Sequence, residues 1–67
     1  MKIVIFYNPA IDHPQYGLLD NIQAWEGGKL LRDEYYEYAS VTRNEVERFI
    51  EEVRKDFPGA EIEDTTL

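Results

Sequence analysis

The chain contains no cysteine, one histidine and one serine, and these shortages restrict the chemistry that it can support. Without cysteine it has no disulfide and no thiolate metal ligand, which fits a reducing compartment. His13 is held extended by Pro14, so its neighbour Asp12 is not placed in a hydrogen bond to it. Ser40 has no histidine near it in the sequence, and nothing supports a catalytic triad. We therefore expect no catalytic residue, no cofactor and no metal, and a binding protein instead of an enzyme.

Basic residues are also scarce, and no apolar run is long. The chain has 7 Lys and Arg against 14 Asp and Glu, which gives a net charge of −7. Contacts to phosphate or to anionic lipid need Lys and Arg, so direct binding to nucleic acid or to a membrane is disfavoured. The longest apolar run, residues 3–7, is too short to span a bilayer and precedes no signal-peptide cleavage pattern, so we expect a cytoplasmic protein. A basic protein surface is the natural partner, although acidity can also serve solubility alone.

The length and the apolar content predict a single domain over residues 1–67. Residues 2–7 form a near-continuous apolar run, which predicts a buried strand. Residues 8–21 include Pro9 and Pro14, and they predict a connecting loop that packs on the core through its own apolar side chains.

Residues 22–33 predict a β-hairpin, because Gly27-Gly28 suits the two central positions of a type I′ turn. The second strand of this hairpin continues to about residue 40, so its far half needs another neighbour, and the strand at residues 2–7 is the expected one. We expect Trp25 to face the core. The hairpin register predicts the cross-strand pairs Glu26–Lys29, Trp25–Leu30 and Ala24–Leu31.

Residues 42–57 predict an amphipathic helix that begins with a capping box of Thr42 and Glu45 and ends before Pro58-Gly59. Its apolar residues form one stripe at helical spacing, namely Val46, Phe49, Ile50, Val53 and Phe57. Residues 60–64 predict a last short strand with Ile62 inward. The fold class is therefore α+β: a three- or four-stranded, mostly antiparallel sheet with one amphipathic helix on one face, in the order β-loop-β-β-α-β.

The surplus of acidic residues lies outside the helix, on the long strand and near the C-terminus. Period-2 geometry puts Asp33, Tyr35 and Glu37 on one face of the long strand and the intervening residues on the other. Tyrosine is enriched at interfaces, but it is also a good strand former, so these tyrosines can be ordinary sheet residues. If the long strand and the last strand are close together, their acids form one patch. The candidate partner-binding residues are Asp33, Glu34, Tyr36, Glu37, Tyr38, Glu61, Glu63 and Asp64.

The small size, the absence of cysteine, the acidity and the Tyr-carboxylate strand at residues 33–38 resemble small phage-encoded inhibitor proteins of the anti-CRISPR type. Several of those proteins resemble DNA electrostatically, and the resemblance covers composition only. It implies an inhibitor that docks a negatively charged sheet patch on a basic, nucleic-acid-binding surface of a partner protein. Carboxylates two residues apart on a strand lie about 6.6 Å apart, close to two phosphate steps of about 3.4 Å along one DNA strand.

The alternative function is a structural or assembly role, in which the Tyr-rich strand associates edge to edge with another copy or another subunit. The sequence favours a monomer but does not determine the oligomeric state.

Overall fold

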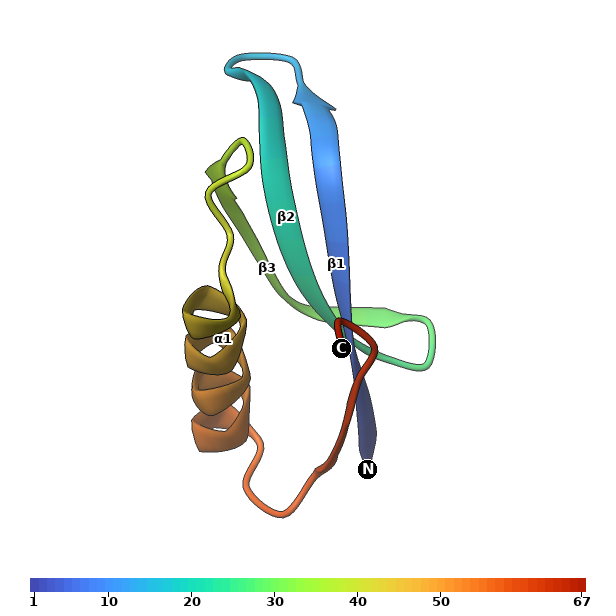
Figure 1. Cartoon of the computed structure of the whole chain (residues 1–67). Helices are drawn as coiled ribbons and strands as arrows, with labels where there is room; N and C mark the ends of the chain where they lie inside the picture. The colour runs from blue at the N-terminus through green and yellow to red at the C-terminus, as the bar shows by residue number, and fades with distance from the viewer.

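The computed structural model describes residues 1–67 as one four-stranded sheet with a single helix on one of its faces (Figure 1). The strand order is β3-β2-β1-β4; β1 pairs antiparallel with β2, β2 pairs antiparallel with β3, and β4 runs parallel to β1. The predicted α+β class with a mostly antiparallel sheet is therefore confirmed. The elements are β1 (Lys2–His13), β2 (Gly17–Glu26), β3 (Lys29–Glu37), α1 (Arg43–Asp56) and β4 (Glu61–Asp64).

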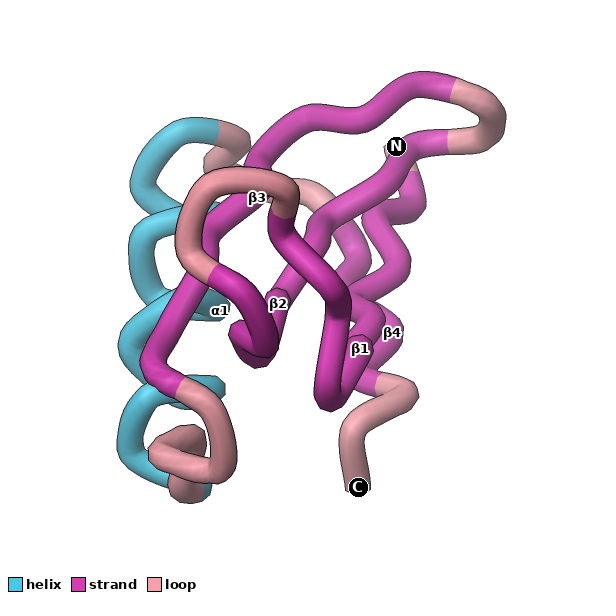
Figure 2. Tube along the Cα trace, turned by 90° about the horizontal axis from the view of Figure 1, so that it is seen from above, coloured by secondary structure: helices cyan, strands magenta, loops and turns pink.

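The core lies between α1 and the two central strands, and Figure 2 shows α1 on one side of the sheet only. The predicted helical stripe is correct for its first four members, which are buried, whereas Phe57 is half-buried against the same core. Alternate residues of the strands meet this stripe, as period-2 geometry requires. The fully buried apolar residues are Ile3 and Ile5 of β1, Ile22 and Ala24 of β2, and Val46, Phe49, Ile50 and Val53 of α1.

The helix begins as the sequence predicts. Thr42 is the N-cap, and the Glu45 carboxylate accepts a hydrogen bond from the Thr42 backbone N–H at 3.1 Å. This satisfies a donor that the helix itself leaves free. The helix is neither long enough nor apolar enough to span a membrane.

The prediction of a loop at residues 8–21 is wrong, because most of this segment extends β1 and β2 into one long hairpin. In Figure 1 this hairpin reaches beyond α1 at the top of the view. Pro9 lies where the register shifts between Asn8 and Ile11, a β-bulge at which an absent backbone N–H costs no ladder hydrogen bond. The hairpin therefore accommodates a proline that the sequence pattern interprets as a strand breaker.

The prediction that the far half of the long strand pairs with the strand at residues 2–7 is also wrong, since β2 lies between β3 and β1. The far half of β3 pairs with residues 19–21 of β2, which belong to the segment predicted as loop. The predicted pairs Glu26–Lys29 and Trp25–Leu30 are confirmed. Ala24 pairs with Arg32 instead of Leu31, because the register shifts there and leaves Leu31 as an extra residue of β3.

A buried carboxylate of β2 links β1 to the turn that follows β3. Asp20 of β2 is 1% exposed and accepts three hydrogen bonds: from the Tyr7 hydroxyl at 3.0 Å, the Ala10 backbone N–H at 3.1 Å and the Ala39 backbone N–H at 3.0 Å. Both alanines have left-handed backbone conformations, with φ of 55° and 60°. Asp20 thus stabilises the bulge of β1 and the turn that leads from β3 to α1.

Candidate functional site

The predicted acidic residues lie at the two opposite edges of the sheet. Asp33 and Glu37 belong to β3, and Glu61 and Glu63 belong to β4, with β2 and β1 between them. Three strand spacings separate these edges, roughly 14 Å. The condition for one continuous acidic patch, that the two acidic strands lie close together, is therefore not met.

Two acids of the C-terminal strand are paired with cations of the same chain. Glu63 forms an ion pair with Lys2 at 2.8 Å. Asp64 is turned to the helix side, where Arg43 and Thr66 donate hydrogen bonds to its carboxylate. Partial burial acts to raise the pKa of Asp64, but these hydrogen bonds outweigh it and leave the pKa below its ordinary value. Asp64 therefore holds the C-terminal segment to α1 and presents little free charge.

The β3 residues divide between the two faces of the sheet as predicted. Asp33, Tyr35 and Glu37 pair with Gln23, Asn21 and Leu19 on the face away from α1, whereas Glu34 and Tyr36 face α1. Tyr38 lies just beyond β3, in the turn, and is exposed.

The face of the sheet opposite α1 carries apolar side chains that nothing covers. We call this surface the open face. Because Ile3, Ile5, Ile22 and Ala24 point to α1, their neighbours along β1 and β2 point the other way. Val4, Trp25 and Leu30 pair side by side across β1, β2 and β3, and Phe6 lies next to Val4's row. Phe6 is 41% exposed, Leu30 is 40% exposed and Tyr35 is 46% exposed.

The prediction that Trp25 faces the core is wrong, because Trp25 lies on this open face and is half-buried among its neighbours. Its indole N–H donates to the Gln23 side chain at 2.9 Å. Indole at a surface with one polar contact and a large apolar area is typical of binding sites.

A chain of polar side chains crosses the open face from β1 to β3. Asn8 donates to Asn21 at 3.1 Å, and the Asn21 amide donates to the Asp33 carboxylate. Gln23 donates to the same carboxylate oxygen at 3.4 Å. These contacts fix the side chains in place before any partner arrives, and none of them supplies a cationic partner to Asp33.

Free negative charge borders the apolar centre of the open face. Asp33 and Glu37 on β3 and Glu61 on β4 form no ion pair. Lys2 of β1, which lies next to β4, is paired with Glu63. The open face is thus an apolar strip with an acidic border on each side.

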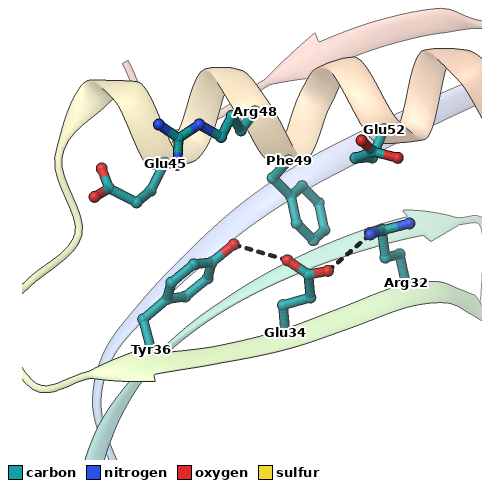
Figure 3. A pocket seen from close by; sticks show the side chains of 7 residues that line it. All are labelled: Arg32, Glu34, Tyr36, Glu45, Arg48, Phe49 and Glu52. Atoms are coloured by element: carbon teal, nitrogen blue, oxygen red, sulfur yellow. Dashed lines mark hydrogen bonds and ion pairs between the residues drawn. The ribbon is translucent and has the colours of Figure 1, made fainter.

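A groove of about 320 Å³ lies on the other face, between α1 and β3. Figure 3 looks into it across the outer edge of β3, with α1 above and the β3 side chains pointing up toward the helix. Three carboxylates, two guanidinium groups and two aromatic rings line it: Arg32, Glu34, Tyr36, Glu45, Arg48, Phe49 and Glu52.

The β3 side of the groove is held by a hydrogen-bonded triad. Glu34 accepts the Tyr36 hydroxyl at 2.8 Å and an Arg32 guanidinium N–H at 2.7 Å (Figure 3). Burial, and then the hydrogen bond to Glu34, raise the pKa of Tyr36, so its hydroxyl remains a donor. Arg32 also contacts Asp56 at 3.3 Å and lies 5.8 Å from the centre of the Phe49 ring, whereas Arg48 forms no ion pair.

The polar groups that suggest catalysis lie apart from the groove and from each other. His13 accepts the Gln15 backbone N–H at its Nδ1 and packs between Tyr16 and Tyr35, with ring centres 5.1 Å and 5.3 Å away. Ser40 donates its hydroxyl to the Glu37 carbonyl. Neither residue contacts the other, and Asp12 points to the opposite side of β1 from His13.

The open face was missed by reasoning from the sequence, although one signal points to it. Residues 3–6 are apolar at every position, and so they require apolar surroundings on both faces of β1. A chain with one helix can cover one face only, which leaves Val4 and Phe6 uncovered. Arg32, Arg48 and Glu52 of the groove carry no comparable signal, because the sequence does not reveal how α1 is offset over β3.

Comparisons of the chain with protein-family models, with curated proteins and with solved structures find no match.

Proposed function

We propose that this chain is a protein-binding module that docks the open face of its sheet on a partner whose apolar patch is flanked by Lys and Arg. The observation that carries the proposal is the uncovered apolar strip of Phe6, Trp25 and Leu30 with acidic residues at both borders. Contiguous exposed apolar surface rimmed by polar residues marks interaction sites on small proteins. The partner is the basic protein surface expected from the sequence, and a nucleic-acid-binding protein is one class of partner that offers it.

The charge of the open face favours a different protein as the binding partner and disfavours a second copy of this chain. Two copies that met through their open faces would bring together the acids of Asp33, Glu37 and Glu61 and two net charges of −7. A partner with cations opposite these acids is attracted during diffusion and oriented on arrival. We therefore propose that the protein is a monomer in the absence of its partner.

The spacing of the acidic residues on the open face favours docking through the apolar centre of that face. It does not match a row of DNA phosphates. On the open face the β3 acids Asp33 and Glu37 are four residues apart, about 13 Å, with Tyr35 between them. An inhibitor of the anti-CRISPR type remains a proposal for the biological role, and blocking a basic groove needs only that the open face occupies it.

The test is affinity capture from the cells that make the protein, with variants that separate the two faces. Leu30→Ser removes an exposed leucine from the open face, and Leu18→Ser removes an exposed leucine from β2 on the opposite side. We expect wild type and Leu18→Ser to retain the same basic partner, and Leu30→Ser to lose at least about tenfold in affinity, as truncation of a central apolar contact does. Mass spectrometry identifies the partner, and the dissociation constant of each variant is measured with it.

Equal affinity of Leu30→Ser and Leu18→Ser would place the contact elsewhere and overturn the proposal. Retention that depends on Leu18 and not on Leu30 would do the same. Raising the salt concentration should slow association more than it speeds dissociation, since the acidic border acts mainly on the rate of encounter.

A further inference from the structure

The outer edge of β3 is the longest unpaired strand edge that borders a groove. β3 is nine residues long and lies at the end of the sheet, so its outer backbone groups have no neighbouring strand. An exposed strand edge offers a row of N–H and C=O groups on which an extended peptide can pair.

The hydrogen bonds show which residues of β3 face outward. The Glu34 carbonyl accepts the Asn21 side-chain amide at 3.1 Å, so the backbone groups of Glu34 point to β2. Alternate residues of an antiparallel strand direct their backbone groups to opposite sides. The N–H and C=O groups of Asp33 and Tyr35 are therefore directed away from the sheet.

The groove opens along the same edge. Its walls are the upward side chains of β3 and the side chains of α1, and Figure 3 views it from the free side of β3. A strand added to β3 would project every second side chain into the groove, over the Phe49 ring and beside Glu34 and Glu52. The remaining side chains would lie beside Asp33 and Glu37 on the open face.

We propose that the outer edge of β3 and the adjoining groove bind an extended basic peptide segment, which adds to the sheet as a fifth strand with Lys or Arg at alternate positions. The free carboxylates beside this edge are on the open-face side, so the basic side chains project to that side and the intervening side chains enter the groove. On the groove side, Glu34 is paired with Arg32, Glu52 with Lys55 at 3.7 Å, and Glu45 accepts the Thr42 backbone N–H. On the other side, Asp33 and Glu37 form no ion pair. The inference shares Asp33 and Glu37 with the border of the open face, but it rests on the β3 edge and does not use the apolar strip of the open face.

Peptide binding tests the inference directly. The probe is fluorescein-labelled acetyl-Lys-Thr-Lys-Thr-Lys-Thr-Lys-Thr-amide, and its dissociation constant for the full chain is measured by fluorescence anisotropy. Two further peptides carry N-methyl groups on all the Lys or on all the Thr residues. In a paired strand only one of these sets points to β3, so we expect one N-methylated peptide to bind at least about tenfold more weakly and the other to bind as the parent does.

Equal affinities of the two N-methylated peptides would mean that the peptide is held by charge alone, and this would overturn strand addition. Undetectable binding of the parent peptide would also overturn it. The third contrary outcome is a stable dimer in light scattering whose edge is already occupied by a second copy.

Variants of the chain give a second readout. Asp33→Asn removes an unpaired carboxylate beside the β3 edge, and Glu51→Gln removes one from the exposed outer side of α1. We expect Asp33→Asn to weaken peptide binding about threefold, in the range of an exposed ion pair, and Glu51→Gln to leave it unchanged. Equal losses of affinity in the two variants would mean that the peptide is held by nonspecific electrostatic attraction.

Proline at an outward position blocks the edge and leaves the β2 ladder intact. Tyr35→Pro should abolish the difference between the two N-methylated peptides, whereas Tyr35→Ala should keep it. If Tyr35→Pro does not fold, the peptide comparison on the wild-type chain still decides. Phe6→Ser should leave peptide binding unchanged, so failure of this inference and failure of the open-face proposal are distinguishable.

Discussion

Phe49→Ala is expected to lower the free energy of unfolding by about 4 kcal/mol, which is most of the stability that a domain of this size has. Phe49 is 1% exposed and is the largest side chain in the core between α1, β1 and β2. Its removal leaves a cavity that α1 cannot close, because the helix is also held at its N-cap and through Arg43 to Asp64. Urea unfolding followed by circular dichroism measures the loss.

Phe6→Ala is the matched control for this substitution. It removes the same side chain from the open face, where 41% of the residue is already exposed to solvent. We expect it to cost less than about 1 kcal/mol, since a side chain that remains in contact with water loses less on truncation. A cost for Phe6→Ala comparable to that for Phe49→Ala would show that the open face is covered in the free protein.

Asp20→Asn is expected to destabilise the fold by about 2–3 kcal/mol although the two side chains have nearly the same shape. The Asp20 carboxylate accepts from the Tyr7 hydroxyl and from the backbone N–H groups of Ala10 and Ala39. An amide presents one N–H₂ group to these three donors, so at least one buried donor loses its acceptor. Thermal unfolding at neutral pH measures the effect.

The control for Asp20→Asn is Asp12→Asn, which makes the same chemical change at an exposed position of β1. That variant should unfold within about 0.5 kcal/mol of wild type. Unchanged stability of Asp20→Asn would mean that the bulge in β1 and the turn after β3 form without the carboxylate.

The parts of the fold that depend on local signals were predictable from the sequence. The capping box of Thr42 and Glu45 and the apolar stripe define α1 within one turn, and Gly27-Gly28 defines the hairpin turn. Gly27 has a φ of 57° but Gly28 has no positive φ, so the predicted two-residue turn is confirmed and its predicted type I′ is wrong, because positive φ at the first central residue alone is the pattern of type II′. These features need only residues that are close in the sequence.

The long hairpin of β1 and β2 could not be predicted in this way. The bulge in β1 accommodates Pro9 without loss of a backbone hydrogen bond between the strands. The bulge is stabilised by Asp20, which accepts the backbone N–H of Ala10, ten residues away in the sequence. Asp20 in the sequence is an acid in a proline-containing segment, which is typical of a loop. Once this hairpin was missed, the strand order was missed too, because β2 is the strand that separates β3 from β1.

The candidate site was only half predictable for a related reason. The residues of β3 were assigned to the correct faces by their alternation, but which of the candidate acids keep a free charge depends on the cations that pair with them. Arg32 neutralises Glu34, Lys2 neutralises Glu63 and Arg43 neutralises Asp64. Two of these ion pairs cross between elements, so no sequence pattern reveals which acids stay free.

The fluorine NMR signal of 5-fluorotryptophan at position 25 tests the central claim most directly. Trp25 is the only tryptophan of the chain and lies in the middle of the open face, so one signal reports on that surface. With the partner isolated by capture, the open-face account predicts a shifted signal that loses its sensitivity to solvent D₂O in the complex. A signal that keeps its free position and its solvent sensitivity in the saturated complex would contradict the account.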